Sequence, residues 1–246
     1  MPGVHGEVSC LQLELPRRKL RRFLALFVAI VLAVSTAARL LWIAAPGLPG
    51  TRFFGHVLYV DQEQSLPTLL SVLLLAVCAC ALGAVALVTG KQRRREYRHW
   101  LALSLLFCAL ASDEYLALHE RLIDPLRERL GAGGLLYFTW VVPGLAFVVI
   151  VAVLFARFVL SLPPRVRREL VLAGACYVGG VLGMEMLGGL YAEGHSISDL
   201  AFLPFPTIEE GLEMAGAALL LDTTVEYLRV HLGVDAVELV LEPNTV

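Results

Sequence analysis

The chain has 246 residues, of which 58% are hydrophobic and only 17% charged, and its mean hydropathy is +0.73. A soluble globular domain is roughly 45–50% apolar and about 25% charged, so this composition excludes that class and predicts a membrane protein with several spans. The net charge of −2 says little about nucleic acid. The chain carries no long basic arm and no aromatic RNA-binding motif, so no nucleic-acid partner is expected.

Six apolar runs of about the length of a membrane span follow one another along the chain. They cover residues 23–45, 66–89, 99–120, 135–161, 169–191 and 207–229. The sequence therefore predicts an all-α fold, a polytopic membrane protein built as a six-transmembrane-helix bundle. Residues 1–22 form a basic cytoplasmic segment, 23–229 the transmembrane domain, and 230–246 a cytoplasmic tail.

The first apolar run follows a charged start and could be mistaken for a signal peptide, but it is longer than a typical signal core. We expect an uncleaved first helix. Proline and glycine at Pro143-Gly144 predict a kink in the fourth span. The five cysteines are interpreted as small packing residues rather than as a disulfide framework or a metal site. They are Cys10, Cys78, Cys80, Cys108 and Cys176.

Two spans carry stripes of small residues, which allow helices to approach closely. The second span has Ala76, Cys80 and Ala84 at four-residue spacing, and the fifth has Gly179 and Gly183 in a GxxxG pattern. The expected surroundings are the lipid bilayer and a homo-oligomer formed through these faces.

Basic residues mark the cytoplasmic side, because lysine and arginine concentrate in cytoplasmic loops. With the N-terminus inside, the inner segments hold fifteen basic residues, in the ranges 17–22, 91–98 and 157–168 and at Arg229. The outer segments hold four, Arg52, Arg121, Arg127 and Arg129. The bias predicts that both termini are cytoplasmic.

The third span contains a stretch that is unusual at membrane depth, with three carboxylates and a histidine between Asp113 and Glu120. Ionisable groups there are costly and are candidates for function. The span runs outward, so Asp113 lies roughly 10 Å below the outer surface. At 100° per residue, Ser112, Asp113, His119 and Glu120 fall within about 100° of one another, whereas Glu114 points elsewhere.

Two further spans bring acids to the same outer layer. Glu185 lies about 6–9 Å from the outer end of the fifth span. Glu209, Glu210 and Glu213 fall in the first two turns of the sixth span and cover about 100° of its surface. Arg39, late in the first span, comes to a similar depth. These acidic faces are expected to meet inside the bundle, where charges in membranes usually point.

Structural explanations exist for part of this pattern. Thr207 followed by Glu210 is a capping box, and acids in a first helical turn favour the helix dipole. That would account for Glu209 and Glu210, but it does not explain Glu213. Glu120 would pair with the neighbouring arginine at a wet helix end.

Glu185 has its own structural alternative, an ion pair with Arg39. A pairing of this kind would make both charges part of the scaffold. It leaves Asp113 unexplained, because that residue lies one to two turns deeper than the wet end of its span.

The alternative is a divalent metal ion as cofactor. Carboxylates with a histidine suit Mg²⁺, Mn²⁺, Fe²⁺ or Zn²⁺, and acids this close cannot all ionise without a cation or protons. The candidate ligands are Asp113, His119, Glu120, Glu185 and Glu213. Among these, Asp113, Glu120 and Glu213 are also candidate catalytic groups. The supporting positions are Arg39, Ser112, Glu209 and Glu210. The pattern is unspecific, since neither HExxH nor paired ExxH is present.

Three functions fit the pattern. The first is metal-dependent chemistry on a lipid-borne substrate, with a spare carboxylate as general base. The second is a cation- or proton-coupled transporter, whose carboxylates would look much the same. The third is a structural or assembly protein in which the charges only pair.

The motifs Asp113-Glu114 with His119-Glu120-Arg121-Leu122, a lone Glu185 in a glycine-rich span, and Ile208-Glu209-Glu210 followed by Glu213-Met214 resemble an uncharacterised family of bacterial multi-pass membrane proteins. The resemblance covers roughly residues 99–229. It implies that the acids and the histidine of these motifs are the family's polar positions, and that the protein lies in a bacterial plasma (inner) membrane. It implies no activity.

Overall fold

The computed structural model describes residues 16–234, and the regular elements in this range are helices. The all-α prediction is therefore confirmed for this range. The predictions that concern residues 1–15 and 235–246 lie outside the described residues, including Cys10 and most of the two cytoplasmic segments.

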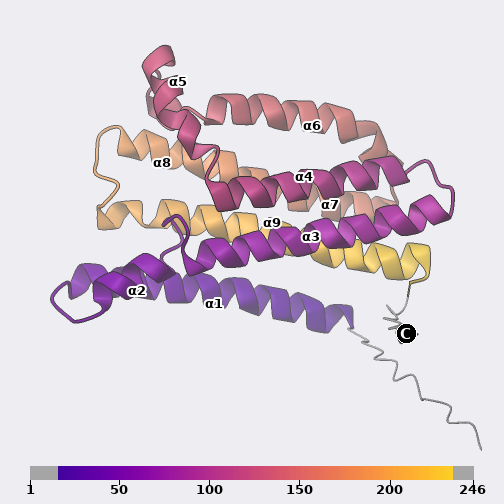
Figure 1. The fold of residues 1–246 in the computed structure, drawn as a ribbon, viewed down its shortest axis with the longest axis horizontal. Helices are drawn as coiled ribbons and strands as arrows, with labels where there is room; N and C mark the ends of the chain where they lie inside the picture. Colours follow the sequence, from indigo (N-terminus) through magenta and orange to yellow (C-terminus); the bar gives the residue numbers. More distant parts are fainter. Residues whose placement is uncertain (1–15, 235–246) are drawn as a thin grey trace, which may run out of the picture.

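Six long helical passes run back and forth along the described part of the chain (Figure 1). They are α1 (Arg17–Ala44), α3 (Leu66–Lys91), α4 (Tyr97–Leu116), α6 (Val141–Ser161), the succession α7 (Pro164–Val178), η3 (Gly179–Met184) and α8 (Glu185–Ala192), and α9 (Pro204–Leu232). Shorter elements join them: α2 (Thr51–Leu58), η1 (Glu120–Leu122), α5 (Ile123–Leu130), η2 (Gly134–Leu136) and η4 (Leu200–Phe202).

Four passes are long and apolar enough to cross a membrane, namely α1, α3, α6 and the continuous stretch Pro164–Ala192. A fifth is added if α4 and Glu120–Leu130, which are bent by 67° relative to each other, count as one span. The helix α9 is not among these candidate spans, because acidic residues are spread along its length and leave no sufficiently apolar stretch. The fold is that of a membrane protein with four to five candidate spans, and six spans with cytoplasmic termini stay a prediction.

The helix α9 occupies the centre of the bundle. It packs against α1, α3, α7 and α8, and one continuous face of it is buried. Its apolar members join leucines of α1 and α3 and Trp100 of α4 in the main core. A helix that is buried on a wide face while carrying acids must satisfy those acids inside the protein. This position of α9 decides where its glutamates lie.

The helices α3 and α4 pack closely through small residues. Ser104 of α4 donates a hydrogen bond of 2.8 Å to the carbonyl of Ala79, and Gly83 faces the same serine. The predicted stripe lies beside this contact, and its member Cys80 is exposed. An oligomer formed through this face stays a prediction.

Two helix starts differ from the prediction. α6 begins at Val141 rather than at residue 135, so Pro143 lies in its first turn, where proline is well tolerated, and does not produce the predicted kink. α9 begins at Pro204, so Thr207 lies inside the helix and its hydroxyl donates back to the carbonyl of Leu203 at 2.8 Å. The predicted capping box is therefore wrong, because proline starts the helix three residues earlier.

The helices α7 and α9 approach to backbone contact at Gly216. A Cβ atom there would lie 2.7 Å from the nitrogen of Tyr177 and 2.8 Å from the carbonyl oxygen of Ala173. Both neighbours are main-chain atoms of α7, so they cannot move aside without moving the helix. This contact sets the distance between α9 and the pass that carries Glu185.

We expect Gly216→Ala to lower the free energy of unfolding by about 1–3 kcal/mol, because the added methyl overpacks the α7–α9 contact. Gly174→Ala is the matched control, since an added Cβ at that position of α7 meets no atom within 4 Å. Circular dichroism of both purified variants during thermal denaturation checks the difference. Equal midpoints would contradict the close approach.

Candidate acidic site

Acids from four parts of the chain gather at one end of the bundle, on the left in Figure 1, where α4 ends and α9 begins. Their carboxylates act on one another electrostatically across element boundaries. We call this group the acidic cluster. It consists of Asp61, Glu63, Asp113, Glu114, Glu120, Glu185, Glu209, Glu210 and Glu213.

The helix α4 ends earlier than predicted, at Leu116, because Ala117 adopts a left-handed conformation with φ of 48°. The predicted common helical face of Asp113, His119 and Glu120 is therefore wrong. Asp113 and His119 meet through the turn instead. The Asp113 carboxylate accepts the His119 backbone N–H at 3.2 Å and contacts the ring nitrogen Nδ1 at 2.6 Å. These two bonds stabilise a turn that is costly for alanine.

The structure places two other predicted residues at the edge of the site. Ser112 is exposed, and its hydroxyl donates back to the carbonyl of Cys108 at 2.8 Å, so it faces away from the acids. Glu120 lies on η1 beyond the helix break and shares a side-chain hydrogen bond with Glu63 of the loop before α3.

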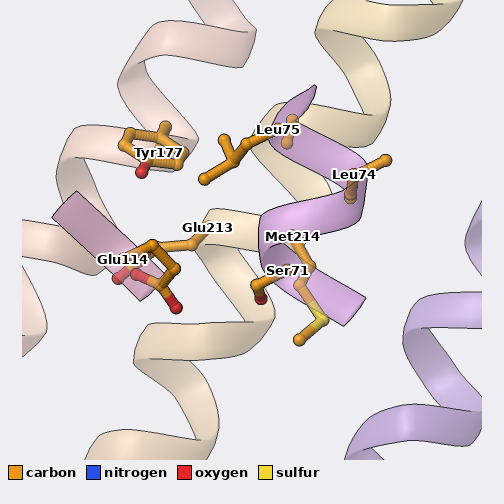
Figure 2. A pocket seen from close by; sticks show the side chains of 8 residues that line it. Ser71, Leu74, Leu75, Glu114, Tyr177, Glu213 and Met214 are labelled. Carbon is orange, nitrogen blue, oxygen red and sulfur yellow. The ribbon is translucent and has the colours of Figure 1, made fainter. Parts of the chain in front are cut away.

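Glu114, expected to point elsewhere, lies in the interior. Together with Glu213 of α9, Tyr177 of α7 and Ser71 of α3 it lines a small cavity whose remaining wall is apolar. Figure 2 shows the Tyr177 hydroxyl and the two glutamates on one side of this space and the α3 wall opposite. The volume open to the centre of a water-sized sphere is about 10 Å³, roughly what one water requires.

Glu185 and Glu209 form a pair between α8 and α9. The two carboxyl groups lie close enough to interact directly, and the indole N–H of Trp140 donates to Glu185 at 2.7 Å. Trp140 also lies against the ring of His119, with centroids 4.6 Å apart. Trp140 therefore connects the α4 turn with the α8–α9 pair.

The residue that allows η3 and α9 to approach is Gly180, not the predicted pair Gly179 and Gly183. A Cβ at Gly180 would lie 2.6 Å from the carbonyl oxygen of Glu209 and 2.9 Å from Cγ of Glu213. At Gly179 and Gly183 it would meet nothing within 4 Å. The segment η3 has π-helical hydrogen bonding, and such turns recur at functional sites.

Arg39 does not form the predicted ion pair with Glu185. Its guanidinium lies between the rings of Trp42 and Tyr59, 4.7 Å from each centroid. Within the described residues, no ion pair with lysine or arginine neutralises the glutamates of the acidic cluster on α4, α8 and α9. The cluster thus combines many carboxylates with little compensating charge.

A preformed metal site is not supported by this geometry. In the range 16–234, no three histidine, cysteine, aspartate or glutamate side chains are arranged to hold a metal ion. The five predicted ligands divide instead into the Asp113–His119 turn, the Glu120–Glu63 contact, the Glu185–Glu209 pair and the Glu213 cavity. The predicted ligands are therefore not gathered into one coordination sphere.

Sequence reasoning missed five residues of the site. Asp61 and Glu63 lay in a loop, and Glu114 was assigned to the wrong face because the helix break was not foreseen. Trp140 and Tyr177 carried a usable signal, since buried aromatic residues with a polar tip usually find a hydrogen-bonding partner.

Comparison with protein families gives one match, to the model described as a domain of unknown function, DUF8692, over residues 23–226. The chain belongs to the DUF8692 family. The DUF8692 match contains the whole acidic cluster, from Asp61 to Glu213. Comparison with curated proteins and with solved structures finds no match.

Asp61 provides a prediction for pH dependence. Burial of the Asp61 carboxyl group by the surrounding protein and electrostatic repulsion from Glu185 together raise its pKa from 3.8 to about 7. Part of the residue remains exposed to solvent. Between pH values of about 4 and about 7, the Asp61 carboxyl is more protonated in the folded protein than in the unfolded chain. The contribution of Asp61 to the free energy of unfolding therefore falls as the pH rises through this range. Thermal midpoints measured across this range should fall less steeply with pH in Asp61→Asn. If the thermal midpoints of the wild type and of Asp61→Asn fell equally with pH, the raised pKa of Asp61 would be contradicted.

Proposed function

We propose that the protein is a membrane protein whose acidic cluster takes up and releases protons in exchange for cations, as part of a cation- or proton-coupled transport process. The observation that carries the proposal is the Glu185–Glu209 pair, in which two carboxyl groups interact directly and, among residues 16–234, no lysine or arginine is ion-paired with either. Two neighbouring carboxyl groups of this kind favour a state in which one of them is protonated.

Charge balance supports protons as the resting occupants. The glutamates of the acidic cluster on α4, α8 and α9 are half-buried, and like charges at this proximity cannot all be ionised. Release of a proton would leave a carboxylate that attracts a cation from the aqueous face. A site of this kind couples the two ions through competition for the same oxygens.

Breaks in the helices support transport. α4 stops beside Asp113 and turns by 67°, and the fifth pass has a π-helical segment directly before Glu185. Ion sites of transporters are commonly formed where membrane helices are interrupted, because freed backbone groups and acids then face a common cavity. Interrupted helices are also the positions at which a bundle bends most easily.

The charge bias of the loops supports an orientation. It favours the acid-rich end on the outer side of a bacterial plasma (inner) membrane, with six spans and cytoplasmic termini. The acidic cluster would then receive its cation from outside.

The test uses protein reconstituted in liposomes that contain a pH-sensitive dye. Inward gradients of Na⁺, K⁺, Mg²⁺ or Mn²⁺ are imposed in turn, and we expect at least one of them to change the internal pH. Glu209→Gln keeps a hydrogen bond but cannot release the shared proton. It should reduce the initial rate at least about tenfold, which corresponds to about 1.4 kcal/mol.

Glu193→Gln is the control, since Glu193 is exposed in the loop after α8 and lies outside the acidic cluster. It should exchange at the wild-type rate. Absence of a pH response to all four cations in vesicles of folded protein would refute the transport proposal.

A second candidate, metal-dependent chemistry on a lipid-borne substrate, is favoured by one observation. The Asp113 carboxylate binds Nδ1 of His119 at 2.6 Å, the arrangement that orients a metal-binding histidine and leaves its other ring nitrogen for the ion. In this candidate Asp113 positions the ligand, and Glu120, Glu185 and Glu213 would have to move toward His119.

Metal analysis after incubation with MnCl₂ and gel filtration tests the second candidate. It predicts about one bound ion per chain, as expected for a single site, in the wild type and its loss in His119→Gln. An equal metal content in both proteins, or none in either, would count against it.

A further inference from the structure

The end of the bundle opposite the acidic cluster carries a network of charged side chains that joins three helices. We call it the inner network. In Figure 1 it lies toward the right-hand end, where α1 begins and α9 ends. Its members are Arg17 and Arg21 of α1, Arg165 and Glu169 of α7, and Asp222 and Glu226 of α9.

Arg17 is the centre of the inner network. Its Nη2 lies 2.7 Å from a carboxylate oxygen of Glu169 and 2.7 Å from one of Asp222. Its Nη1 lies 3.2 Å from Glu226, and its Nε donates a second bond to Asp222 at 3.1 Å. One planar guanidinium thus holds acids of two other helices, which a lysine could not do with the same geometry.

The remaining basic residues complete the charge balance. Arg21 donates to Asp222 at 2.8 Å and lies 3.3 Å from Glu169. Arg165 lies 3.4 Å from Glu169 on the same helix. Three arginines and three acids give the inner network no net charge, in contrast with the acidic cluster.

Burial of these charged side chains costs desolvation free energy, which makes ion pairs a weak means of stabilising the contact between these helices. The side chain of Asp222 is 2% exposed and that of Arg17 14%. Replacing a buried ionic network with apolar residues is often neutral or stabilising, so stability alone does not explain it. In addition, Nη1 of Arg17 forms its ion pair with Glu226 at 3.2 Å without hydrogen-bond geometry among the described residues. An incompletely satisfied network is easier to open than a complete one.

The space between the two clusters is closed. Asp222 and Glu213 are nine residues apart on α9, about 13 Å along its axis. The side chains between them are apolar. Beyond Asp222, the hydroxyl groups of Thr223 and Thr224 donate back to carbonyls of their own helix at 2.7 and 2.8 Å. Cys78 of α3 lies in this layer, fully buried, with its sulfur 3.2 Å from the carbonyl of Ala217.

The geometry also indicates which part moves. α7 and α9 are in backbone contact at Gly216, so they form one unit. Among the described residues, the hydrogen bonds that join α1 to this unit are those of Arg17 and Arg21. Opening these bonds leaves the start of α1 held to α7 and α9 by the apolar packing of Leu20 and Leu24 in the main core.

We propose that the inner network is a releasable lock that closes the bundle on the side opposite the acidic cluster. Release separates the start of α1 from α7 and α9 and admits water to the layer around Cys78. The proposal rests on the proposed function in one respect, since it supplies the second closure that a coupled transporter needs.

Cys78 serves as a native reporter of the lock. Cys10, Cys80, Cys108 and Cys176 are replaced by alanine, and membrane vesicles are prepared with the N-terminal side outward, as verified by protease removal of an N-terminal tag. A membrane-impermeant cationic methanethiosulfonate is added, and the initial rate of Cys78 modification is measured by mass spectrometry. We expect slow modification in this background and an increase of at least about tenfold in Asp222→Asn and Arg17→Gln.

Two further variants define the mechanism. Arg17→Lys keeps the positive charge but loses the planar guanidinium that binds several carboxylates at once. The rate of Cys78 modification in this variant should therefore lie between those of the background and of Arg17→Gln. Arg22→Gln alters an exposed arginine of α1 outside the inner network and should leave the rate unchanged.

Unchanged modification of Cys78 in folded Asp222→Asn and Arg17→Gln overturns the proposal. If both fail to fold, Arg21→Gln and Glu226→Gln replace them, because these side chains lie at the more exposed rim, 46% and 22%. An unchanged rate of Cys78 modification in these two variants also overturns the proposal. The liposome assay separates the two proposals: faster modification together with absent wild-type transport keeps the lock and removes the transport function.

Discussion

The constraint on which this structure depends is the presence of many carboxylates in a bundle that offers them few cations. Burial of an uncompensated carboxylate costs several kcal/mol, so each acid must share a proton, accept a hydrogen bond or attract an ion. Glu185 and Glu209 lie against each other, while Asp113 binds His119. The contacts of these acids among the described residues are thus made locally, pair by pair.

The two ends of the bundle solve the same electrostatic problem in opposite ways. At the inner end, Arg17 and Arg21 neutralise Glu169 and Asp222 through direct contacts. At the other end, Arg39 stacks between two aromatic rings and leaves the acids without a guanidinium contact. A neutral, interlocked end and an acidic one give the molecule a charge polarity along its axis.

Close packing makes this arrangement possible. Gly216 brings α7 and α9 into backbone contact, and Gly180 lets η3 touch the backbone of Glu209. With side chains larger than hydrogen at these two positions, the glutamates of α9 would lie farther from Glu185 and Tyr177. The glycines of the fifth pass therefore position acids, whereas the neighbouring Gly179 and Gly183 stay open on the outer face of the helix.

The sequence by itself determined the helical class, the membrane character and the gathering of acids at one end, because hydrophobic runs and charge placement are local properties. It misassigned Glu114, because the inward face of α4 was inferred together with His119 and Glu120, which the left-handed Ala117 places beyond the helix. It also missed the start of α9, which begins at Pro204. The partners of each acid were decided only by tertiary structure. Trp140, Tyr177 and Arg17 reach their acids across 36 to 205 positions of sequence. Contacts of that separation depend on how helices pack, and no local pattern encodes them.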